Sequence, residues 1–132
     1  MLSVLVFFLG LSMCLPLFVA LYYHDGTAWA FFISIMVTCG FGGLMFLFTR
    51  GHQDFYLSHR DGIAIVSLGW IIAGMTATLP YLVSGAIPDF TLAYFESISG
   101  FTTTGASILR NIEALPPAIL FWRAQTQWMG GM

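Results

Sequence analysis

Residues 97–107 read Ser97-Ile98-Ser99-Gly100-Phe101-Thr102-Thr103-Thr104-Gly105-Ala106-Ser107, a hydroxyl-rich and glycine-punctuated run between two segments apolar enough to span a bilayer. Within a membrane, unpaired N–H and C=O groups cost several kcal/mol. Non-helical chain is therefore tolerated there only where it is buried in protein or lines a watery cavity. The run is predicted to be a pore loop.

Composition places the whole chain in a membrane. Of its 132 residues, 58% are hydrophobic and only 8% are charged, whereas soluble domains carry roughly 25% charged residues. The charged residues fall mostly in the gaps between apolar runs. A protein that binds nucleic acid needs a basic face, and the formal net charge of -2 argues against such a partner. The lipid bilayer is the partner that the composition predicts.

Three apolar runs are long enough for spans of about 20 residues. They are Leu2 to Tyr23, with a kink expected at Pro16, then residues 27–49, and then residues 62–84. A polar connector joins the last two. A cleaved signal peptide is the alternative for residues 1–24, but Lys and Arg are absent before Arg50, and the first run exceeds the roughly 7 to 15 apolar residues of such a peptide.

After the third run, Asp89 is a plausible N-cap for a short helix through about Ser99. Eleven residues extend only about 16 Å, roughly half of the hydrocarbon thickness. The chain must therefore enter the membrane and return to the same side. A fourth apolar segment then starts near Leu115 and stops at Met132. The predicted fold is an all-α membrane protein with three transmembrane helices, a re-entrant pore helix with a filter loop, and the start of a fourth transmembrane helix.

Positive charges set the expected orientation. Arg50 and Arg60 lie in the short connector between two clear spans, which places that connector on the cytoplasmic side. The amino terminus is then cytoplasmic, and residues 85–114 lie on the outer side.

The loop has the chemistry of a cation filter. Dehydrating an alkali cation requires several oxygens in place of its water, and backbone carbonyls supply them without a fixed charge. Residues 102–105 can supply four carbonyls. Gly105 is the residue that lets a short strand turn its carbonyls toward one axis, and Gly100 is expected to form the turn out of the short helix. The C-terminal end of that helix adds a partial negative charge that favours cations. An ordinary polar loop is the alternative.

Two charged side chains lie within the apolar context, where each should be paired or functional. Glu96, one turn before the loop, is expected to accept hydrogen bonds from loop N–H groups and so support the filter; direct ion coordination is the alternative. Arg123 needs a partner or a polar cavity. Structural pairing is favoured over a gating or ion-repelling role.

The remaining reactive side chains carry no predicted chemistry. Cys14 and Cys39 lie inside apolar runs as small buried hydrophobes. The histidines lie in connectors without the spacing of a metal site, and no cofactor is expected. The tryptophans are interpreted as interfacial anchors or packing residues.

Two motifs together resemble those of the Trk/Ktr/HKT superfamily of potassium transporters, most closely its bacterial Trk branch. The first is Phe95-Glu96-Ser97-Ile98-Ser99-Gly100-Phe101-Thr102-Thr103-Thr104-Gly105-Ala106-Ser107, and the second is Phe121-Trp122-Arg123-Ala124-Gln125-Thr126-Gln127-Trp128-Met129-Gly130-Gly131-Met132. In that family, four linked helix, pore-helix, helix units surround one ion path, and the Trk branch adds a helix pair in front. The resemblance implies an accessory helix pair at residues 1–50, a cytoplasmic connector at 51–60, and a first unit at 61–132 that is cut off in its second helix.

The same resemblance implies potassium uptake across the bacterial cytoplasmic (inner) membrane, with potassium as the substrate. Thr102, Thr103, Thr104 and Gly105 carry over as filter residues, with Thr103 and Thr104 placed at the potassium ion. It also implies symport as a mode of transport, a homodimer of membrane subunits, and a cytosolic nucleotide-binding regulatory subunit. None of these partners is derived from the residues themselves.

Two other interpretations are open. The chain could be a small cation channel subunit that assembles as a homotetramer around four copies of the loop, or a membrane scaffold protein that transports nothing. An intramembrane enzyme is disfavoured, because no nucleophile and base lie at suggestive positions. A single loop cannot encircle a cation, so the preferred interpretation is one filter segment of four.

Overall fold

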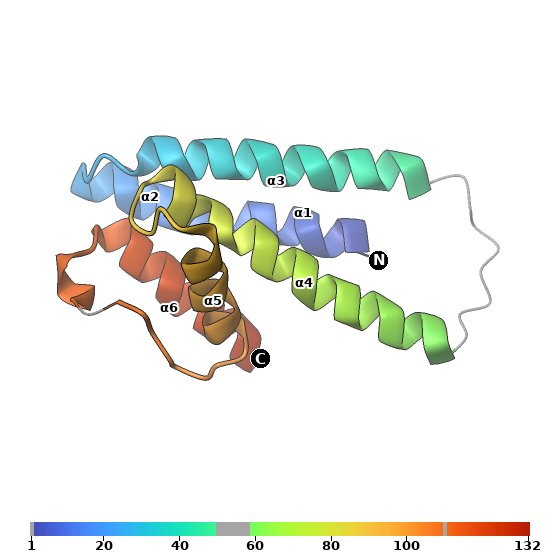
Figure 1. Ribbon diagram of the computed structural model, residues 1–132. Helices are drawn as coiled ribbons and strands as arrows, with labels where there is room; N and C mark the ends of the chain where they lie inside the picture. The colour runs from blue at the N-terminus through green and yellow to red at the C-terminus, as the bar shows by residue number, and fades with distance from the viewer. Residues whose placement is uncertain (1, 50–58, 110) are drawn as a thin grey trace.

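The computed structural model describes residues 2–49, 59–109 and 111–132. Within these ranges all regular structure is helical, as predicted (Figure 1). The helices are α1 (Leu2–Ser12), α2 (Cys14–Tyr23), α3 (Ala28–Thr49), α4 (His59–Val83), α5 (Phe90–Phe101), the short 3-10 helix η1 (Ile112–Ala114) and α6 (Pro117–Gly131).

Three helical stretches among the described residues are long and apolar enough to cross a membrane. They are Leu2–Tyr23, Ala28–Phe48 and Arg60–Val83, which confirms the three predicted spans to within two residues at each end. Of the connector predicted at 51–60, residues 51–58 lie outside the described part of the chain, as do Arg50 and Arg110. Helix α4 begins already at His59, two residues before the predicted start of the unit at 61.

The first span is two helices rather than one. Met13 separates α1 from α2, and its N–H is shared between the carbonyls of Leu9 and Gly10, each at 3.3 Å. Pro16 follows three residues later, and proline both removes an N–H and crowds the preceding turn. The kink expected at Pro16 therefore takes the form of a break at Met13.

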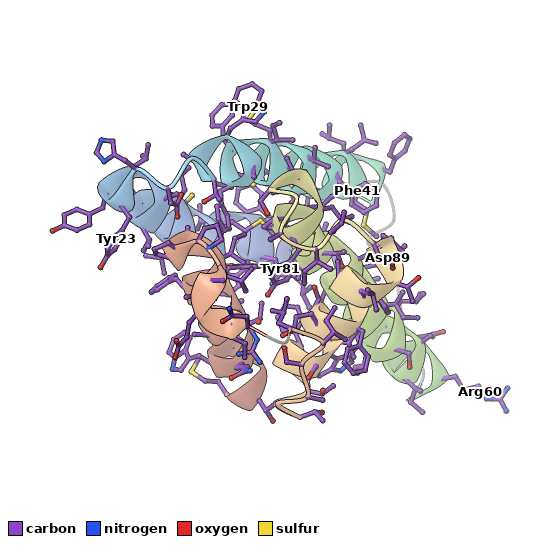
Figure 2. All side chains as sticks on the ribbon, turned by 60° about the vertical axis from the view of Figure 1, so that its left-hand side comes forward. Tyr23, Trp29, Phe41, Arg60, Tyr81 and Asp89 are labelled. Carbon is purple, nitrogen blue, oxygen red and sulfur yellow. The ribbon has the colours of Figure 1, made fainter. Side chains whose placement is uncertain are left out.

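Helices α1 and α2 run along α3, and α4 crosses them to carry α5 on its second half (Figure 1). Helix α6 lies between α2 and α5 and contacts both. The largest fully buried side chains come from all six α-helices and the α1–α2 break, and they include Trp122, Tyr81, Phe31, Met13 and Ile119. Tyr81 lies in the middle of the molecule (Figure 2). Helix α6 is therefore part of the core.

The outer surface is strongly apolar. Trp29 points away from the other helices (Figure 2) and is 69% exposed, and Phe32, Met36, Phe41 and Leu44 on the same helix are also exposed. A soluble domain rarely exposes so large a contiguous apolar face. This surface is suited to lipid.

The short helix begins where predicted and ends later. Asp89 is its N-cap, and the Asp89 Oδ1 accepts a hydrogen bond from the Leu92 N–H at 3.0 Å. The helix continues through Gly100 to Phe101 instead of ending near Ser99. Gly100, expected at the turn out of the helix, is thus helical. The left-handed residue that turns the chain is Thr103, with φ 53°.

Candidate functional site

The candidate site is built around the threonine loop, defined here as residues 102–107. Its first N–H groups are held by the end of α5: Thr102 donates to the carbonyl of Ile98 at 2.8 Å, Thr103 to that of Gly100 at 3.0 Å, and Thr104 to that of Ser99 at 3.1 Å. The last carbonyls of a helix lack helical partners. These bonds therefore pair the free carbonyls of α5 with the N–H groups of the loop. They fix the loop directly against the C-terminal end of α5.

Hydroxyl groups secure the loop further. The Thr102 and Thr104 hydroxyls lie 2.8 Å apart, and the Ser99 hydroxyl donates to the Ala106 carbonyl at 2.5 Å. The Thr103 hydroxyl donates to the Thr102 carbonyl at 2.7 Å. Residues 102–106 are nevertheless exposed. The loop is therefore tied down on one side and open on the other.

Three carbonyls of the loop are left without donors. Within the part of the chain that the structure describes, the carbonyl oxygens of Thr103, Thr104 and Gly105 accept no hydrogen bond. Gly105 has φ +74°, a conformation that side-chain-bearing residues rarely adopt, although a Cβ there would meet nothing within 4 Å. Glycine is needed at 105 for its backbone angle and not for lack of space.

Glu96 lies behind the loop with only 1% of its side chain exposed. Its carboxylate accepts the Ser107 hydroxyl at 3.0 and 3.1 Å and the Ile108 N–H at 3.2 Å. The contacts join α5 to the outgoing limb of the loop. A buried carboxylate that accepts several hydrogen bonds is held in a fixed position.

Arg123 on α6 provides the balancing charge. Its Nε lies 2.6 Å from the Glu96 Oε1, and its side chain is 18% exposed. A charge-assisted bond of this length is among the stronger protein hydrogen bonds. Arg123 is thus paired with a carboxylate on the neighbouring helix, and Glu96 links α5, the loop and α6.

Helices α5 and α6 approach each other closely at their C-terminal ends. A Cβ on Gly130 would lie 1.9 Å from the Phe101 carbonyl oxygen, and one on Gly100 would lie 2.5 Å from the Thr126 hydroxyl oxygen. At Gly130 the obstacle is backbone, so only a residue without a side chain fits there, whereas at Gly100 the Thr126 side chain would have to move. The structure therefore gives Gly100 a packing role next to the loop.

Ser107 and Gly130 are site residues that sequence reasoning did not single out. Ser107 belongs to the hydroxyl-rich run, and its spacing from Glu96 across a turn gave no periodic signal. Gly130 lies in an apolar segment where small residues commonly permit close helix packing. That rule could have found it, had the partner segment been known.

The described residues hold no group of three or more His, Cys, Asp or Glu side chains that could bind a metal ion. Cys14 and Cys39 are both free thiols. Among the described residues of the loop, the backbone carbonyls of Thr103, Thr104 and Gly105 are exposed and accept no hydrogen bond.

Comparisons with known proteins bear on this arrangement. The family model described as TrkH, cation transport protein, matches residues 27–132. The Trk system potassium uptake protein TrkH of Halomonas elongata is 42% identical to this chain over 132 residues, which are 99% of this chain and 27% of that protein. The protein of the same name from Escherichia coli is 39% identical, covering 98% of this chain and 27% of its own length.

The fold is also similar to a solved structure. The crystal structure of the potassium transporter TrkH from Vibrio parahaemolyticus matches with a TM-score of 0.90 at 36% identity, covering 98% of this chain and 28% of that one. The chain thus spans about a quarter of the length of the curated relatives it matches.

Proposed function

The chain belongs to the TrkH family of cation transport proteins, and we propose that it supplies one filter segment of a potassium uptake protein. In this proposal α5 is a re-entrant pore helix, and Thr102, Thr103, Thr104 and Gly105 present backbone carbonyls to a potassium ion. Relatives named as potassium uptake proteins support this substrate. The family is one of transporters and not of enzymes.

The observation that carries the proposal is the set of unpaired carbonyls on an exposed loop. An unpaired carbonyl is costly in a membrane, and those of Thr103, Thr104 and Gly105 have no donor among the described residues. Such oxygens can coordinate a cation that has lost its hydration water. The C-terminal end of α5, against which the loop is held, adds negative potential at the same place.

One loop cannot surround an ion, so the proposal requires further units. Three more filter segments of the same longer chain would complete a pseudo-fourfold pore, in which residues 61–132 form the first unit and residues 1–50 an accessory helix pair. The proposal also includes a homodimer of such chains with a cytosolic nucleotide-binding regulatory subunit, which is what the family resemblance implies. Symport is consistent with this assignment.

We place the protein in the bacterial cytoplasmic membrane with a cytoplasmic amino terminus. Under this topology the turn at residues 24–26 and the start of α6 lie on the same, outer side. The hydrogen bond from the Ala118 N–H to Asp25 supports that arrangement, because it joins these two segments.

The test replaces Gly105 in a full-length transporter that contains this sequence. Gly105→Ala forces a side chain into a left-handed conformation, at a cost of about 1 kcal/mol, and is expected to rotate the adjacent carbonyls. The expected result is a several-fold fall in the ratio of rubidium to sodium uptake, measured per transporter in the membrane.

Gly85→Ala is the matched control. Gly85 has φ +73°, and a Cβ there would also meet nothing within 4 Å, so the backbone strain is the same but the position is remote from the loop. This variant is expected to keep the wild-type uptake ratio. An unchanged ratio in Gly105→Ala would contradict the filter assignment.

A further inference from the structure

Helix α6 begins without a capping side chain of its own. Its N-cap is Pro116 and its first residue is Pro117, and proline side chains accept no hydrogen bond. The N–H groups of a first turn need acceptors. Asp25, in the turn between α2 and α3, supplies one, since its Oδ2 accepts the Ala118 N–H at 3.1 Å.

The same carboxylate also serves α3. The Asp25 Oδ1 accepts the Thr27 N–H at 2.9 Å and the Thr27 hydroxyl at 2.6 Å. One side chain therefore joins the start of α3 to the start of α6, across 93 positions of sequence. Each of its oxygens is committed to a different helix.

A second polar contact joins α6 to the break between α1 and α2. Pro16 has no N–H, so the Ser12 carbonyl four residues earlier lacks its usual helical partner. The Gln125 Nε2 donates to that carbonyl at 2.8 Å. In a bilayer a carbonyl freed by proline is satisfied by a neighbouring helix, and Gln125 provides that donor.

These two contacts bracket Arg123. Asp25 holds the second residue of α6 and Gln125 holds its middle, so both the axis and the rotation of the helix are constrained. Arg123 lies between them and bonds Glu96, and Glu96 bonds the limb of the threonine loop. A contiguous chain of contacts thus runs from α1–α3 to the loop.

We infer that Asp25 and Gln125 are positioning residues, through which α1–α3 set the placement of α6 and thereby the geometry of the threonine loop. The inference rests on the proposed function, because it takes the loop to be a filter segment. It assigns to the accessory helices a role in ion selection beyond anchoring the chain in the membrane.

The first test uses Asp25→Asn and Gln125→Leu in the full-length transporter. Asparagine keeps one acceptor oxygen but replaces the other with an NH₂ group, so one of the two caps is lost. Loss of a cap or of a hydrogen bond of this kind corresponds to about a fivefold change in an equilibrium constant. Each variant is expected to raise the apparent KM for rubidium or lower the rubidium to sodium ratio by about that factor, at measured membrane abundance.

Gln127→Leu is the matched control for Gln125→Leu. Gln127 lies two residues further along α6, and its side chain makes no hydrogen bond within the described ranges. The Gln127→Leu variant is expected to keep the wild-type KM for rubidium and the wild-type ratio of rubidium to sodium uptake. If Asp25→Asn and Gln125→Leu lower only the abundance, while KM and the ratio per transporter stay unchanged, their role is merely structural and the inference is overturned.

A double-mutant cycle tests the contact to the break directly. Pro16→Ala restores an N–H that can donate to the Ser12 carbonyl, so Gln125 is no longer required there. Gln125→Leu should therefore have a clearly smaller effect in the Pro16→Ala background than alone. Equal effects in both backgrounds would overturn the assigned role of Gln125.

A readout independent of transport separates this inference from the proposed function. Spin labels at the exposed positions of Trp29 on α3 and Trp128 on α6, each changed to Cys, report the distance between these helices in an otherwise cysteine-free chain. Asp25→Asn is expected to shift or broaden that distance distribution, and an unaltered distribution would overturn the positioning role. If Gly105→Ala changes the uptake ratio while Asp25→Asn and Gln125→Leu do not, only this inference falls.

Discussion

At the residue scale, the Glu96 carboxylate is the point where three segments meet. It accepts hydrogen bonds from Ser107, Ile108 and Arg123, and it is almost fully buried. Removing one member of a buried ion pair leaves the other uncompensated, which is costlier than removing both. The pair with Arg123 should therefore show strong energetic coupling.

Glu96→Gln is expected to destabilise the folded protein more in the wild-type background than in the Arg123→Leu background. In the first case the arginine loses its counter-charge, and in the second there is no charge left to compensate. The coupling free energy should be about 1 to 3 kcal/mol. Thermal unfolding of the purified full-length protein in detergent, followed for all four members of the cycle, measures it.

Glu113→Gln serves as the control for this cycle. Glu113 is exposed in η1 and makes no ion pair within the described residues, so its neutralisation should change stability by less than about 0.5 kcal/mol. Additive effects of Glu96→Gln and Arg123→Leu would contradict the assigned coupling.

At the scale of elements, the crossing of α5 and α6 determines how the loop is held from behind. The helices meet backbone to backbone, because a Cβ on Gly130 would lie 1.9 Å from the Phe101 carbonyl oxygen. Protein backbone cannot yield as a flexible side chain can. The spacing between these two helices is thus set by glycine.

Gly130→Ala is expected to force α5 and α6 apart, with a loss of stability of about 1 to 3 kcal/mol or more. Gly131→Ala is its control, since a Cβ there would meet only the Thr103 Cγ2, at 3.6 Å, an ordinary contact. Thermal unfolding of both variants measures the difference. A Gly130→Ala protein as stable as Gly131→Ala would contradict the close crossing.

At the scale of the whole molecule, the helices place two distant turns at one end. The turn at residues 24–26 lies beside the start of α6 through the Asp25 contact to Ala118. If Leu2–Tyr23, Ala28–Phe48 and Arg60–Val83 each cross the membrane, the 24–26 turn and η1 share one side, and Asp61 lies on the other.

Cysteine labelling of intact cells tests this topology. In a cysteine-free full-length background, Glu113→Cys is expected to react with a membrane-impermeant maleimide from outside, whereas Asp61→Cys should react only after the cells are opened. The expectation follows from the positively charged connector being retained in the cytoplasm. The reverse labelling pattern would show an outward amino terminus.

Much of the fold follows from local sequence. The three spans were predictable because a continuous apolar run of about 20 residues has few alternatives to a transmembrane helix. The start of α5 was predictable because aspartate is a favoured N-cap residue, and the Asp89 side chain accepts the N–H of Leu92, three residues later. The end of α5 was not, because its last turn, including Gly100, is held by packing against Thr126 on α6.

The sequence by itself determined that the chain is a helical membrane protein with a polar, glycine-containing loop between apolar segments, and that Glu96 and Arg123 need partners. These features depend on the length of apolar runs, on helix capping and on the cost of burying a charge. Each of these effects acts over a few neighbouring residues, so it can be predicted from the sequence alone. Only the tertiary structure decided that these two charges pair with each other, that Asp25 caps α6 and that Gln125 meets the Ser12 carbonyl. Those contacts join residues that lie 27, 93 and 113 positions apart, and no local spacing encodes which helices will pack together.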